Sequence, residues 1–69
     1  MNGLMLCTVV ALNILSAPGG VVVGAVPDHK RVQIEDVSLL RDYVFVSKPG
    51  SDGSSPRGWI AYGGLGRCQ

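Results

Sequence analysis

Two cysteines and one histidine are the residues of this chain best suited to covalent or metal chemistry. Cys7 lies in an apolar N-terminal segment, and Cys68 lies close to the other end of the sequence. If the N-terminal segment is removed from an exported chain, Cys68 is left alone, and a single remaining cysteine is typical of an intermolecular disulfide. The sequence therefore predicts a disulfide-linked dimer through Cys68, and the alternatives are a reactive thiol and a cysteine without a role.

The histidine has no set of metal ligands around it in the sequence. His29 stands alone, whereas a structural zinc site needs about four ligands at close spacing. The serine and aspartate residues form no recognisable catalytic triad with it. The run Gly63-Gly64-Leu65-Gly66 does not match the glycine patterns of nucleotide-binding loops. We therefore expect no catalytic residue, no metal site and no cofactor, and we predict that the chain is not an enzyme.

The aromatic residues are the candidates for a binding surface, because Trp and Tyr offer a large contact area at a low cost in side-chain entropy. They lie in two apolar runs and are Tyr43, Phe45, Trp59 and Tyr62. An alternative interpretation is that the rings only pack on each other across a hairpin. Both interpretations depend on a β-hairpin over residues 43–62, in which the two runs pair as strands.

A dibasic pair offers a candidate site of proteolytic processing. Lys30 and Arg31 follow a proline in a short polar stretch, which reads as an accessible linker over residues 26–31. Cutting after this pair would release residues 32–69 as a peptide. Near the end of the chain, Gly66 followed by Arg67 has the order that peptide amidation uses. The alternative for both features is chance.

The N-terminal segment has the pattern of a secretion signal. Residues 1–27 carry no charged side chain, and ten of the twelve residues in 4–15 are apolar. This length suits the apolar core of a signal peptide, which runs to about 7–15 residues, and we expect it to form a helix. Cleavage after Ala25 is favoured over cleavage after Gly19, so the sequence predicts a signal peptide over residues 1–25.

One feature of the same segment favours a different interpretation. No Lys or Arg precedes the apolar run, and the nearest basic residues lie on its C-terminal side. By the positive-inside rule, that side would stay in the cytosol. The 23 uncharged residues of 4–26 could then remain as a membrane anchor, which needs about 20 residues. If the segment stays uncleaved, the chain would contact a membrane only through it.

The sequence of the remaining residues, 32–69, indicates little regular structure. Residues 32–35 alternate apolar and polar side chains, which indicates a short strand, and 36–42 suit either a helical turn or extended chain. Residues 47–58 are rich in Gly, Pro and Ser and are typical of a turn region. We expect a small, mostly irregular chain with an apolar N-terminal helix, a short β-hairpin and no stable independent core.

Charge and size narrow the possible functions. The net charge is +1 over 69 residues, and acidic residues are interleaved with the basic ones. This pattern argues against nucleic acid as a partner. We expect a small secreted peptide that acts extracellularly by binding a protein or receptor, for example as a host-defence effector. The alternatives are a processed, hormone-like peptide ligand and a small single-pass membrane-anchored protein.

Overall fold

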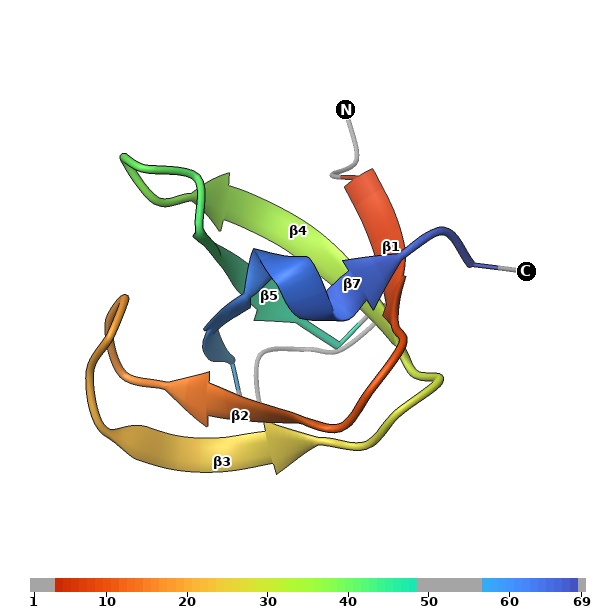
Figure 1. Ribbon diagram of the computed structural model, residues 1–69, viewed down its shortest axis with the longest axis horizontal. Helices are drawn as coiled ribbons and strands as arrows, with labels where there is room; N and C mark the ends of the chain where they lie inside the picture. Colours follow the sequence, from red (N-terminus) through yellow and green to blue (C-terminus); the bar gives the residue numbers. More distant parts are fainter. Residues whose placement is uncertain (1–3, 49–56, 69) are drawn as a thin grey trace.

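The computed structural model describes residues 4–48 and 57–68, which form a curled antiparallel sheet (Figure 1). Seven strands and one short 3-10 helix make up the described chain: β1 (Leu4–Thr8), β2 (Leu12–Leu15), β3 (Val22–Val26), β4 (Arg31–Val37), β5 (Tyr43–Ser47), β6 (Gly58–Ala61), η1 (Tyr62–Gly64) and β7 (Leu65–Gly66). Their order across the sheet is β3-β2-β6-β5-β4-β1-β7. The described residues contain no α-helix.

The predicted N-terminal helix is wrong, because residues 4–15 form strands β1 and β2. An apolar run of this length does not by itself distinguish a helix from buried strands. In the structure, β1 pairs with β4 from Leu4 opposite Ile34 to Cys7 opposite Arg31, and β2 pairs with β3 and β6. Partners far away in the sequence therefore fix the strand conformation, and the predicted mostly irregular fold is corrected to a seven-stranded sheet.

Two short connections show that the sheet curls round on itself. β1 and β2 stand four places apart in the strand order, yet residues 9–11 are all that joins them. β6 and β7 are likewise distant in the order, and only η1 lies between them. A hydrogen bond from the Val9 N–H to the Gly64 carbonyl oxygen, 3.0 Å, joins these two connections. The inner faces of the strands therefore enclose one core.

The core draws on both halves of the chain. The buried apolar side chains are Ile14, Val32, Val44, Val46 and Ile60, and the half-buried side chains packed against them are Leu12, Val26, Ile34 and Leu65. Full burial of a branched apolar side chain contributes about 1.5–3 kcal/mol to stability. The prediction that no independent core forms is wrong, because it left out the side chains that the N-terminal segment brings to the core.

A close approach between β2 and β6 depends on a glycine. A Cβ atom at Gly58 would lie 2.8 Å from the carbonyl oxygen of Leu15 and would also overlap the Ile14 side chain. Only a residue without a Cβ lets the two strands come this close. The glycine thus lets Ile14 fill the core directly beneath β6.

The predicted division of the chain into a signal peptide, a linker and a mature peptide stays a prediction. Residues 4–26 hold strands β1, β2 and β3. A chain cut after Ala25 would lack all of β1 and β2 and all but the last residue of β3, and a cut after Gly19 would remove β1 and β2. Among the described residues, no helix is long and apolar enough to cross a membrane.

Candidate interaction surface

The strand register separates the aromatic residues from the core. β5 and β6 pair from Tyr43 opposite Ala61 to Val46 opposite Gly58, over the segment predicted to form the hairpin. Side chains alternate between the two faces of a strand, and Val44, Val46 and Ile60 are the buried ones. Tyr43, Phe45 and Trp59 therefore lie on the outer face of the sheet, where all three are half-buried.

Two of these outer rings pack against each other. Phe45 and Trp59 are directly opposite in the register, and their ring centroids are 5.4 Å apart at an interplanar angle of 67°. This edge-to-face contact is a favourable arrangement of aromatic rings. The Arg57 guanidinium lies 5.9 Å from the centroid of the Phe45 ring, within the range of a cation–π contact. These rings are therefore in mutual contact, as the alternative interpretation of the sequence required.

The most exposed apolar side chains lie at the tip of the β4–β5 hairpin. Leu39 is 97% exposed and Leu40 is 82% exposed. Single exposed apolar residues are common on protein surfaces. Leu39 and Leu40, however, are consecutive. Because both are largely exposed, they gain little of the free energy that burial would give. No pattern in the sequence indicates that these leucines form a candidate site.

The leucines stand on a turn with a defined backbone. The Ser38 N–H donates to the Tyr43 carbonyl oxygen and the Arg41 N–H donates to the Ser38 carbonyl oxygen, both at 2.9 Å. The Ser38 hydroxyl donates to Asp42 Oδ1 and accepts from the Tyr43 N–H, both at 3.0 Å. Arg41 has a φ of 61°, a left-handed conformation that tight turns use. The exposed leucines are thus carried by an ordered turn.

Two tyrosines lie beside this turn. Tyr43 directly follows it on β5, and the Tyr62 N–H donates to the Asp42 carbonyl oxygen at 3.0 Å. Tyr62 is 47% exposed and lines a hollow of about 340 Å³ together with Val37 and Arg41, which lie on either side of the leucines. We name the two leucines and the two tyrosines the tip surface: Leu39, Leu40, Tyr43 and Tyr62. Of the four predicted aromatic residues, the structure therefore places two here and two in the Phe45–Trp59 contact.

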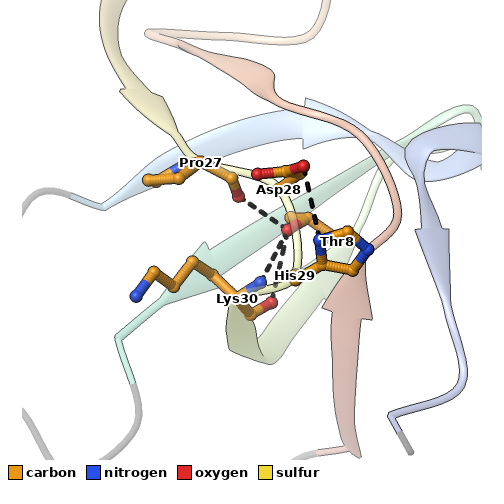
Figure 2. Close-up of polar contacts among 5 residues, drawn as sticks. All are labelled: Thr8, Pro27, Asp28, His29 and Lys30. Atoms are coloured by element: carbon orange, nitrogen blue, oxygen red, sulfur yellow. Dashed lines mark hydrogen bonds and ion pairs between the residues drawn. The ribbon is translucent and has the colours of Figure 1, made fainter.

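A second ordered turn holds the predicted dibasic site. Thr8 is 1% exposed, and its hydroxyl donates to the Pro27 carbonyl oxygen at 2.7 Å and accepts from the Lys30 N–H at 2.9 Å (Figure 2). Backbone bonds run from the His29 N–H to the Thr8 carbonyl oxygen, 2.8 Å, and from the Thr8 N–H to the Lys30 carbonyl oxygen, 2.9 Å. Arg31 is already paired with Cys7 in the sheet. Residues 27–30 therefore form a tight connection between β3 and β4.

The cysteines form a bond within the chain. Cys7 and Cys68 are joined by a disulfide with an S–S distance of 2.04 Å, across 61 residues of sequence. In this structure, Cys68 is therefore not available for the predicted bond to a second chain. That dimer stays a prediction for a processed chain that has lost Cys7. The signal that could have indicated the pairing was the even cysteine count of the whole chain.

The other predicted processing residues lie in and beside the β2–β3 hairpin. Gly19 is in the turn with a φ of 73°, and Ala25 is in β3 opposite Asn13. In the described part of the chain, no group of three or more His, Cys, Asp and Glu side chains could hold a metal ion. His29 Nδ1 lies 3.3 Å from an oxygen of Asp28 at the surface.

Comparison of the chain with known protein families, with curated proteins and with solved structures finds no match in any of the three. The site must therefore be interpreted from its own geometry. That geometry is an ordered apolar tip flanked by tyrosines, on a small sheet in which a disulfide links β1 to the segment that follows its neighbour β7.

Proposed function

We propose that this chain is a small secreted protein that acts outside the cell by binding a protein partner through the tip surface. The observation that supports the proposal most strongly is the exposure of Leu39 and Leu40 on a hydrogen-bonded turn. Burial of these side chains against a partner would release their apolar hydration, which is the main driving force of protein association. Because the turn is ordered before binding, little loop entropy is lost on association.

The tyrosines support the same surface. Tyr is enriched among the residues that dominate binding energies, and the Tyr62 ring combines a large apolar area with a hydroxyl that can bond to a partner. The backbone bond between Tyr62 and Asp42 keeps this ring beside the turn. A partner that covers the leucines would therefore also meet at least one tyrosine.

The disulfide supports the extracellular location. Disulfides persist in oxidising compartments and are rare in the cytosol, where thiols are kept reduced. Small secreted domains commonly use them, because a small core alone gives little stability. The proposed functional form is accordingly the intact domain with Cys7 bonded to Cys68. A role in host defence would act through a specific target, because the net charge of +1 is too low for attraction to anionic membranes.

A comparison of two matched double variants tests the proposal. Leu39→Ser with Leu40→Ser removes the apolar tip, and Val21→Ser with Val23→Ser removes two exposed valines from the β2–β3 hairpin. Partners are captured from extracellular fluid on the immobilised wild-type chain, and the affinity of each variant is then measured. We expect the tip variant to bind at least about thirty-fold more weakly, since a dominant contact contributes about 2 kcal/mol or more.

The valine variant should bind like the wild-type chain. Both variants should keep their stability within about 0.5 kcal/mol, because they change surface side chains. Equal binding by the tip variant and the wild-type chain would contradict the proposal. Equal loss in both variants would also contradict it, because that result indicates non-specific apolar adhesion.

A further inference from the structure

A second hollow opens at the other end of β4 from the tip surface. It lies where the β3–β4 connection, the start of β4 and the end of β5 meet, and its volume is about 320 Å³. Its apolar wall includes Ile14, Val32 and Val46, which are also buried members of the core. A volume of this size is at the small end of ligand pockets, which run from about 300 to 1,000 Å³. The hollow is therefore suited to a small apolar group.

The charged residues that line this hollow in the described part of the chain are all basic. They are Lys30, Arg31 and Lys48. These three are half of the six basic residues in the sequence, although the net charge of the whole chain is only +1. The register brings them together, because Arg31 starts β4 while Lys48 follows the end of the paired strand β5.

Within the described residues, none of these three cations has a carboxylate partner. Asp28 is close to Lys30 in sequence, but its carboxylate lies against His29. The Lys30 side chain extends from the turn away from that pair (Figure 2). The Thr8 hydrogen bonds to this turn fix the backbone from which Lys30 projects. The site therefore combines a fixed apolar wall with positive charges that no acid among the described residues pairs with.

We infer that this hollow binds a small amphiphilic carboxylic acid, a free acid with a short alkyl chain. The chain would lie against the apolar wall, and the carboxylate would meet the cations at the rim, where charge-assisted hydrogen bonds are stronger than neutral ones. This site is distinct from the tip surface, because the seven residues of β4 separate the two by about 20 Å at about 3.3 Å per residue. The inference does not depend on the proposed partner binding.

Titration of the full oxidised chain with octanoate, followed by methyl and amide NMR, tests the inference. We expect saturable shifts of the Ile14, Val32 and Val46 methyl signals. Octylammonium and octanol present the same chain without the negative charge and should bind at least tenfold more weakly, and acetate should cause no saturable shift. Absence of saturable octanoate shifts, or equal binding of octylammonium, would overturn the inference. Tighter binding of an N-acetylated peptide with a C-terminal leucine carboxylate would overturn the choice of an alkyl acid in favour of a peptide C-terminus.

Two double variants with the same net charge distinguish binding at this hollow from non-specific electrostatic attraction of octanoate to the chain. Lys30→Gln with Lys48→Gln removes two rim cations, whereas Arg57→Gln with Arg67→Gln removes two cations that do not line the hollow. The first variant should bind octanoate at least tenfold more weakly, and the second should bind it like the wild-type chain. Equal weakening in both variants would overturn the site. Unchanged amide spectra of the free variants would establish that both remain folded.

Discussion

Loss of the Cys7–Cys68 bond is the perturbation with the largest expected effect on the fold. The bond closes a loop of 61 residues. In the chain-entropy description, a loop of this length lowers the entropy of the unfolded chain by about 14 cal/mol/K, or about 4 kcal/mol at 25 °C. A chain of this size has a total stability of about 3 to 10 kcal/mol. We therefore expect the Cys7→Ser, Cys68→Ser variant to lose a large share of its stability.

Urea unfolding followed by fluorescence of Trp59, the only tryptophan, measures this effect. The oxidised wild-type chain, the wild-type chain in reductant and the double serine variant are compared. We expect the free energy of unfolding to fall by about 3–4 kcal/mol in the last two. Reductant should not change the double serine variant further, which is the control for effects of the reagent. A loss below about 1 kcal/mol would refute the reasoning, because the strands would then hold together without the bond.

Four further experiments test other contacts. Thr8→Val removes the hydroxyl between Pro27 and Lys30 and should cost about 1–3 kcal/mol in urea unfolding, whereas Thr8→Ser should cost less. Gly58→Ala should cost about 1–3 kcal/mol through overlap with β2, while Gly63→Ala, with no atom within 4 Å of the new Cβ, should be close to neutral by the same assay. Trypsin should cut after Lys30 or Arg31 at least about tenfold more slowly in the oxidised chain than in the reduced chain, because cleavage requires local opening. Trp59→Ala should lower stability by about 1 kcal/mol or more through loss of the Phe45 contact, and partner affinity at the tip should change by less than about threefold.

The positions of β5 and β6 could be predicted from the sequence, because their signal is local. The run Tyr43-Val44-Phe45-Val46 contains only β-branched and aromatic residues, which favour strands, and glycine and proline residues follow it. The N-terminal strands could not be predicted in this way. An apolar run such as residues 4–15 suits a helix or a buried strand equally, and contacts with β4 and β6 decide between them.

The candidate sites depend on contacts that the sequence does not display. Leu39 and Leu40 look like ordinary core residues in the sequence. In the structure they lie in the turn between β4 and β5, which the left-handed Arg41 and the hydrogen bonds of Ser38 form, and both are exposed there. The cluster of cations around the second hollow could not be predicted from the sequence either. Lys48 comes to lie near Lys30 and Arg31 only because β5 pairs with β4.

The most direct test of the intact extracellular domain is targeted mass spectrometry of extracellular fluid and cytosol, alkylated without reduction and digested with trypsin. We expect the extracellular chain to give a peptide that contains Cys7 and ends at Lys30, disulfide-bonded to the tryptic peptide that begins at Cys68. Strands β1, β2 and β3 would then be present in the functional form. An extracellular product that begins at Gly20 or Val26, or a chain found only in the cytosol with both cysteines alkylated, would contradict this.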